Sequence, residues 1–300
     1  MNVLEGDFKD WDKSGLIAGT ALEFGRKLIK RGTKMWDVTL AVEEKIKSLG
    51  GDLAFPVQIN FNEFAAHDCA HHNDERVFKE GDVVKLDCGV TVNGAVGDNA
   101  LTVCLNPVYD DLTKASKEAL QNAIKMCIPG NTTAQIGKSI QETIESYGYK
   151  PVRNLSGHGI GIYKYHTTPN IPNIDIGKGV ELKEGQTIAI EPFSTDGEGM
   201  IKEYGDAEVF CMHSKKPVRS LIARNVSSEL MKFKNMPFAI RQVVNSKLTE
   251  NSVKYGLKEL QMVGAVTAYP PLREVKGGMI AQFEKSIIVA DKPYVLTRSE

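Results

Sequence analysis

Long apolar runs and export signals are both missing from this chain of 300 residues. A helix that crosses a membrane needs about 20 consecutive apolar residues, and no segment approaches that length. The N-terminal sequence MNVLEGDFKDWDKSG is polar and acidic, whereas a secretory signal peptide has a basic start followed by an apolar segment. We therefore expect a cytoplasmic protein with no membrane partner.

Cysteine is sparse, and no two cysteines have the C-x-x-C spacing of a thiolate zinc site. An excess of one charge is absent as well, because the formal net charge is −1 at pH 7. The protein therefore has no overall electrostatic field that would favour a specific nucleic-acid partner. The odd number and wide spacing of the cysteines favour reduced thiols over a disulfide framework; they are Cys69, Cys88, Cys104, Cys127 and Cys211.

Helical and strand-like periods alternate along the chain in two similar blocks. The pattern predicts helices over 9–31, from 37–39 to 49, 111–126 and 133–147, and strands over 56–61, 82–90, 97–105, 152–161, 185–192 and 279–291. This order indicates an α+β protein of two related halves, with helices covering one face of a curved sheet. Residues 196–266 are rich in Lys, Met and Leu at helical spacing, so we expect a helical insertion there and a main domain of 1–195 and 267–300.

Four acids and one histidine stand in short apolar stretches with no evident structural need for charge. A carboxylate buried in such a stretch costs several kcal/mol unless a cation or hydrogen-bond donors meet it. An oxygen-rich set with one imidazole suits two divalent ions such as Mn, Fe, Co or Zn. The candidates are Asp87, Asp98, His158, Glu191 and Glu284.

Each candidate has an ordinary explanation when it is taken alone. An Asp after a strand is commonly a turn former, a His among glycines is commonly a hydrogen-bonded structural residue, and Glu284 could pair with Lys285. Cys88 lies beside Asp87, but neighbouring residues on a strand face opposite ways, so we expect Cys88 to point away. Spacing alone does not specify which residues form one site.

Five longer motifs do specify them. In the order 54–68, 85–103, 156–173, 187–199 and 268–284, they resemble the type 2 methionine aminopeptidases of the creatinase/aminopeptidase superfamily, over nearly the whole chain. The archaeal form is the closer likeness, because the charged N-terminal extension of the eukaryotic members is not seen. The resemblance implies the pita-bread fold, in which two pseudo-symmetric α/β halves surround a curved antiparallel sheet, with a helical insertion in the C-terminal half.

The resemblance also implies roles for the five candidate ligands around two divalent ions of open identity. Asp87 would chelate one metal, and His158 with Glu191 would hold the other. Asp98 and Glu284 would bridge the two. The ions would activate a bridging water for peptide hydrolysis.

The same motifs carry expected catalytic and substrate-binding residues. His67 and His166 match two histidines near the scissile peptide, and Glu191 is our candidate proton acceptor. A further histidine of the family has no clear counterpart in GDAEVFCMH (205–213), so the residue that closes that side of the pocket stays open. Positions that would line a methionine side-chain pocket are Phe55, Tyr165 and Tyr269.

The expected function is removal of the initiator methionine from nascent polypeptides when the second residue is small. We expect a monomer, with transient ribosome association as a further hypothesis. One alternative is an Xaa-Pro peptidase or creatinase-like hydrolase, although such relatives usually carry a separate N-terminal domain and lack the insertion. Another is a non-catalytic RNA- or ribosome-binding relative, although such proteins typically lose the metal ligands that are all present here.

Overall fold

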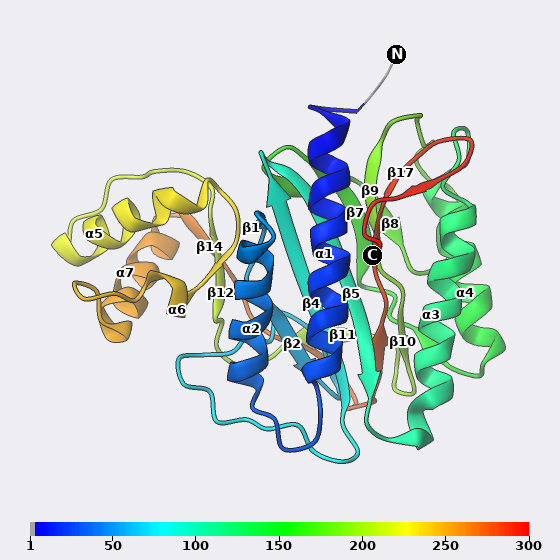
Figure 1. Ribbon diagram of the computed structural model, residues 1–300, viewed down its shortest axis with the longest axis horizontal. Helices are drawn as coiled ribbons and strands as arrows, with labels where there is room; N and C mark the ends of the chain where they lie inside the picture. The colour runs from blue at the N-terminus through cyan, green and yellow to red at the C-terminus, as the bar shows by residue number, and fades with distance from the viewer. Residues whose placement is uncertain (1–3, 300) are drawn as a thin grey trace.

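Two long helices and an antiparallel sheet make up the N-terminal half of the protein in a computed structural model that describes residues 4–299. The helices are α1 (Phe8–Leu28) and α2 (Met35–Ser48). The strands are β1 (Asp52–Leu53), β2 (Gln58–Phe61), β4 (Val83–Val92) and β5 (Ala95–Cys104). β1 and β2 pair with β4 and so does β5, all antiparallel. Both helices cover one face of this sheet (Figure 1).

The C-terminal half repeats this plan. A 3-10 turn η1 (Pro107–Tyr109) leads into α3 (Asp110–Lys125), and α4 (Thr133–Ser146) begins at a capping box of Thr132 and Gln135. The main sheet has the order β18-β17-β9-β7-β8. Its strands are β7 (Ser156–Gly161), β8 (Lys164–Pro172), β9 (Thr187–Ile190), β17 (Lys285–Ile288) and β18 (Tyr294–Val295).

Two small sheets join the halves. One has the order β16-β10-β6 and the other β11-β15-β3. Their strands are β3 (Phe64–Ala66), β6 (Lys150–Pro151), β10 (Phe193–Thr195), β11 (Ile201–Glu203), β15 (Leu272–Glu274) and β16 (Ile280–Gln282). The α+β architecture with antiparallel strands is confirmed.

A separate lobe projects from one side, at the left of Figure 1. Its helices are α5 (Leu221–Leu230), α6 (Ile240–Val243) and α7 (Glu250–Met262), with a 3-10 turn η2 (Met231–Phe233). They pack through their own apolar cluster against the sheet β13-β12-β14, formed by β13 (Phe238–Ala239), β12 (Val209–Met212) and β14 (Val266–Tyr269). The assignment of 196–266 to a separate subdomain stays a prediction. Within this segment, strands β11 and β12 come first and the first helix begins at Leu221.

One predicted strand is wrong in its extent. The apolar run 279–291 is divided between β16, which pairs with β10, and β17, which pairs with β9. The chain changes sheets at Phe283 and Glu284, whose N–H groups donate to Pro192 O and Ala100 O instead of continuing one ladder. This change of partner places Glu284 between the two halves.

Apolar side chains fill the space between the helices and the sheets. In the N-terminal half, Val42 of α2 packs in one cluster with Leu86 and Val90 of β4. In the C-terminal half, Ile140 of α4 belongs to a second cluster with Ile188. Among residues 4–299, no helix combines the length and apolar character needed to cross a membrane.

Candidate metal and active site

The β4–β5 hairpin places Asp87 and Asp98 on the same face of the sheet. A two-residue turn, Asn93-Gly94, with φ of 49° and 90°, joins ten paired positions in continuous register. Asp98 lies opposite Gly89, and Asp87 lies opposite Ala100. Two residues paired across a hairpin point to the same face of the sheet, and successive side chains along each strand alternate between the two faces. Across a two-residue turn, the residue numbers of two side chains on the same face therefore differ by an odd number. The odd separation of the two acids therefore follows from the turn and requires no bulge.

Cys88 faces the other way, as the alternation predicts. Its thiol is buried and lies 3.8 Å from the carbonyl oxygen of Ala18 in α1. Cys88 therefore packs under the helices and takes no part in the site.

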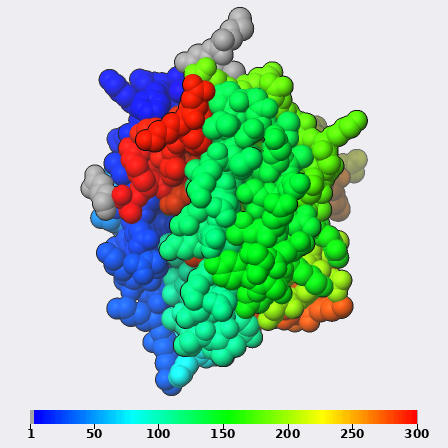
Figure 2. Space-filling model, turned by 90° about the vertical axis from the view of Figure 1, so that its right-hand side faces the viewer, coloured from blue at the N-terminus to red at the C-terminus, as the bar shows by residue number. Residues whose placement is uncertain are grey.

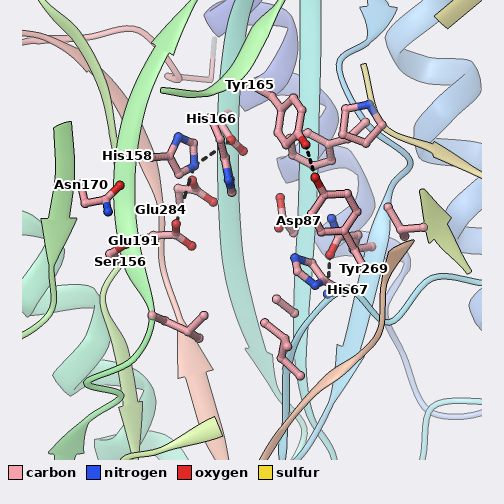
Figure 3. Close-up of a pocket in the computed structure, with 18 of the residues that line it drawn as sticks. His67, Asp87, Ser156, His158, Tyr165, His166, Asn170, Glu191, Tyr269 and Glu284 are labelled. Atoms are coloured by element: carbon pink, nitrogen blue, oxygen red, sulfur yellow. Dashed lines mark hydrogen bonds and ion pairs between the residues drawn. The ribbon is translucent and has the colours of Figure 1, made fainter. Parts of the chain in front are cut away.

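The C-terminal half supplies the remaining candidate ligands. His158 lies in β7, and Glu191 directly follows β9. The Nε2 atom of His158 lies 3.7 Å from Asp98 Oδ2 and 3.7 Å from Glu191 Oε1. Ligand atoms of Asp98, His158 and Glu284 all lie within 4.8 Å of one another. Asp87 lines the same cavity, so the fold brings all five candidates together. Figure 3 labels four of them: Asp87, His158, Glu191 and Glu284.

The imidazole of His158 is held in one orientation. Its Nδ1 lies 3.1 Å from the carbonyl oxygen of Gly159, so a neutral ring with its proton on Nδ1 donates there. Burial lowers the pKa of His158 to about 4, so the ring is neutral near pH 7. Its Nε2 is therefore free to act as a ligand on the side of the carboxylates.

The four carboxylates form a buried anionic cluster that fits a divalent cation. Burial raises the pKa of Asp98 to about 7. Burial, with the nearby acids second, holds the pKa of Asp87, Glu191 and Glu284 well above the usual range. Oδ1 of Asp87 and Oδ1 of Asp98 are buried with no hydrogen-bond partner in the protein. Buried, unpartnered carboxylate oxygens beside a neutral imidazole are the donor set of a borderline or hard metal ion.

Sequence reasoning missed Gln282. This residue is 1% exposed, and its Nε2 lies within 3.5 Å of both Glu191 Oε2 and Glu284 Oε2. It stands between two carboxylates that would otherwise repel each other at close range. The sequence feature that could have identified Gln282 is its position two residues before Glu284, as an amide in the apolar motif AQFE.

His67 is held over the cavity by a second glutamine that the sequence did not reveal. His67 has φ of 67°, and its backbone N–H donates to Oε1 of Gln58, with N···O of 2.6 Å. Its ring Nδ1 lies 3.2 Å from Pro270 O. Burial lowers the pKa of His67 to about 4, which keeps the ring neutral. The positive φ is a strained conformation for a residue with a Cβ, which Gln58 helps to maintain.

His166 lines the cavity beside the candidate ligand His158. Its ring centroid lies 3.8 Å from that of His158 and 4.9 Å from that of Tyr165. The residue is exposed at the cavity. Desolvation within the cavity, with His158 and His67 nearby, lowers its pKa to about 2. His166 is therefore a neutral ring that can donate one hydrogen bond.

An apolar chamber adjoins the polar cluster within a cavity of about 500 Å³. Phe55 lies over Gly89, where a Cβ would come within 2.2 Å of the ring, so only glycine fits beside it. The hydroxyl oxygens of Tyr165 and Tyr269 are 2.7 Å apart, so one hydroxyl donates a hydrogen bond to the other. All three predicted pocket residues therefore line the cavity.

The side of the chamber that sequence left open is lined by Val209 and Pro237, both within residues 196–266. Val209 lies in β12 opposite Tyr269 of β14. His213, in the stretch where a histidine was sought, is exposed and contacts Thr267 Oγ1 at 3.0 Å instead. Polar residues that sequence reasoning also missed line the same cavity: Asn154, Ser156, Thr167, Thr168 and Asn170.

Comparisons with known proteins agree with this geometry. Residues 10–214 match the model of metallopeptidase family M24. The methionine aminopeptidase of Thermococcus onnurineus is 44% identical over 95% of this chain and 97% of its own. Methionine aminopeptidase 2 of Coccidioides posadasii is 33% identical over 100% of this chain and 73% of its own. The solved methionine aminopeptidase of Thermotoga maritima superposes with a TM-score of 0.71 at 26% identity, covering 98% of each chain.

The matches extend over both halves and the lobe. The chain belongs to metallopeptidase family M24 and, within it, to the type 2 methionine aminopeptidases.

Proposed function

We propose that this chain is a metal-dependent aminopeptidase that removes the N-terminal methionine from polypeptides. One observation carries the proposal: an apolar chamber lined by Phe55, Tyr165 and Tyr269 shares a cavity with a buried cluster of four acids and a histidine. Such a chamber suits a flexible, polarisable side chain such as that of methionine. The reacting peptide bond would then lie beside the acids.

Divalent metal ions belong to the site in this family, and the unpartnered carboxylate oxygens fit them. We propose that Asp87 holds one ion, that His158 and Glu191 hold a second, and that Asp98 and Glu284 contact both. Bound ions polarise a carbonyl group and lower the pKa of water, which supplies a nucleophile near neutral pH. Co, Mn, Fe and Zn all suit this donor set.

Glu191 is the proposed proton carrier. The oxygen of the attacking water bonds to the carbonyl carbon of the methionine, and its proton passes to the Glu191 carboxylate. The same proton then moves to the nitrogen of the second residue as the C–N bond breaks. Free methionine and a peptide shorter by one residue are the products.

The two neutral histidines are proposed to orient and stabilise the reacting group. His166 would donate a hydrogen bond to the carbonyl oxygen as negative charge develops on it. His67 has its Nδ1 directed at Pro270 O, so its other ring nitrogen is the one available to the substrate peptide. Holding the peptide at a fixed position lowers the entropic cost of reaching the transition state.

Substrate choice gives a direct prediction. Met-Ala-Ser should be hydrolysed about 100-fold more efficiently than Met-Leu-Ser, because we propose a cramped subsite for the second residue. Release of free methionine, followed as kcat/KM, measures this ratio. Equal values for the two peptides would contradict the cramped subsite. Faster cleavage of Ala-Pro than of Met-Ala-Ser would instead favour an Xaa-Pro peptidase.

We further propose that the protein acts in the cytoplasm as a monomer on nascent chains. Transient association with ribosomes would bring it to these substrates, while the Lys-rich lobe is interpreted as a solvated surface without a specific nucleic-acid partner. Co-sedimentation with ribosomes at low and physiological salt tests the association. Sedimentation of the protein alone measures its oligomeric state.

A further inference from the structure

The two halves meet at a seam beside the candidate metal ligands, where β5 runs antiparallel to β16 and β17. Along this seam the N–H of Glu284 donates to the carbonyl oxygen of Ala100, with N···O of 2.9 Å. Asp98 on β5 and Glu284 at the β16–β17 junction are the two acids proposed to contact both metals. The distance between their carboxylates therefore depends on how β5, in the sheet of the N-terminal half, is joined to β16 and β17.

A hydroxyl group joins the halves at one end of this seam. Oγ of Ser286 accepts from the backbone N–H of Asp98 at 2.8 Å and donates to the carbonyl oxygen of Asp98 at 2.9 Å. Ser286 is fully buried. Both backbone groups of Asp98 point away from β4 and are met by this one side chain.

A second hydroxyl repeats the arrangement at the other end. Oγ1 of Thr102 accepts from the N–H of Gln282 at 2.8 Å and donates to the carbonyl oxygen of Gln282 at 2.8 Å. Gln282 is the residue whose amide lies between Glu191 and Glu284. The two hydroxyl bridges are therefore placed symmetrically about the bond between Ala100 and Glu284.

The hydroxyls occupy places where a continuous sheet would have direct backbone bonds. Between the two bridges the N–H of Glu284 bonds directly to the carbonyl oxygen of Ala100. At the two outer positions an inserted hydroxyl bonds the N–H and C=O groups of Asp98 or of Gln282. The seam is therefore joined by one direct backbone bond flanked by two side-chain bridges.

The C-terminal residues hold one of the two bridges in place. Thr297 is fully buried, and its Oγ1 accepts from the N–H of Ser286 at 3.0 Å. Leu296 lies against α1 so closely that a Cβ at Gly15 would be 2.4 Å from its carbonyl oxygen. Arg298 forms an ion pair with Asp12 of α1 at 2.7 Å. Figure 2 shows this C-terminal segment in red, packed between the blue N-terminal helices and the green C-terminal half.

We propose that Ser286 and Thr102 are positioning residues that set the spacing between Asp98 and Glu284, and that Thr297 fixes Ser286. This inference rests on the proposed function, since it concerns the same metal site. Loss of either hydroxyl would leave the buried N–H and C=O groups of Asp98 or of Gln282 without partners, and the seam would rearrange to satisfy them. Such a rearrangement moves the two carboxylates relative to each other, and changes of this kind around a metal site lower its affinity by about 10–100-fold.

Cobalt titration of metal-free protein tests the proposal with Ser286→Ala and Thr102→Val. Thr102→Ser is the conservative variant, because it keeps the hydroxyl. Ser194→Ala is the matched control: Ser194 is fully buried on β10, and its Oγ donates to the carbonyl oxygen of Leu112 in α3 at 2.7 Å, so its hydroxyl forms neither of the two bridges to β5. Each variant is measured for cobalt affinity, for the visible absorption of bound cobalt, for the unfolding midpoint without metal, and for Met-Ala-Ser hydrolysis.

We expect cobalt affinity to fall about 10–100-fold in Ser286→Ala and Thr102→Val, with an altered cobalt spectrum, and to return in Thr102→Ser. Cobalt affinity and spectra equal to those of Ser194→Ala would overturn the inference. If Ser286→Ala does not fold, Thr102→Val decides the question by the same measurements. A wild-type protein that binds no cobalt or releases no methionine would refute the proposed function instead, so the two failures are distinguishable.

Discussion

Replacing Asp98 with asparagine is expected to lower kcat/KM for Met-Ala-Ser about 1,000-fold, because a ligand proposed to contact both metals is lost. Metal polarisation is worth several kcal/mol at the transition state, and each 1.4 kcal/mol is a factor of ten. The metal-free variant should nevertheless unfold at the same or a higher temperature than the metal-free wild type. Asn has the shape of Asp but removes one negative charge from a buried anionic cluster.

The stability difference should depend on pH. The pKa of Asp98 is about 7 in the folded protein, above its usual value near 3.8. The folded state therefore binds more protons than the unfolded state between these values, and metal-free wild type loses stability as pH rises through this window. Thermal unfolding with chelator at pH 5 and pH 8 should show this loss in wild type and a smaller one in Asp98→Asn.

Asp82→Asn serves as the control for this experiment. Asp82 is also buried, but its carboxylate accepts from the amide of Asn62 at 3.1 Å and from the N–H of Lys79 at 2.7 Å. Its replacement should destabilise the protein and leave cobalt affinity unchanged. Full activity in Asp98→Asn, or a loss of metal-free stability like that of Asp82→Asn, would contradict the assignment of Asp98.

His166→Ala should lower kcat about 100- to 1,000-fold while changing KM and cobalt affinity only slightly. This is the effect of removing one hydrogen-bond donor that acts on a developing oxyanion. The ring of His166 lies against His158 in the open cavity and outside the apolar core, so the unfolding midpoint should change little. Steady-state kinetics on Met-Ala-Ser, together with cobalt titration, separates these quantities.

His213→Ala is the matched control for the histidine variant. His213 is exposed, contacts Thr267, and does not line the cavity. Its loss should leave kcat at the wild-type value. An unchanged kcat in His166→Ala would remove His166 from the mechanism, and a large loss of cobalt affinity would reassign it to the metal site.

The helices and the main hairpin could be predicted from the sequence because they depend on local chemistry. Thr132 and Gln135 form a capping box within four residues, and α4 begins there. Asn93-Gly94 is a turn signal between two apolar runs, and it fixed the register that puts Asp87 and Asp98 on one face. The family motifs then identified the five candidate ligands as one set, which spacing alone did not do.

Contacts between distant segments could not be predicted in the same way. Ser286 is separated from Asp98 by 188 positions in the sequence. Nothing in the sequence around Ser286 distinguishes it from any other buried serine. The predicted strand 279–291 changes sheets at Phe283 and Glu284, because its first part pairs with β10 and its second part with β9, and both partners lie far away in the sequence. Val209 and Pro237 reach the chamber only through the packing of the lobe, so no local pattern marked them as pocket residues.

Methionine release before and after metal removal tests the central claim most directly. The purified protein is treated with chelator, dialysed, and assayed on Met-Ala-Ser before and after addition of Co²⁺ or Mn²⁺. We predict no release of free methionine from the chelated protein and recovery of turnover when metal is restored. Methionine release that continues undiminished in the chelated protein would contradict the account.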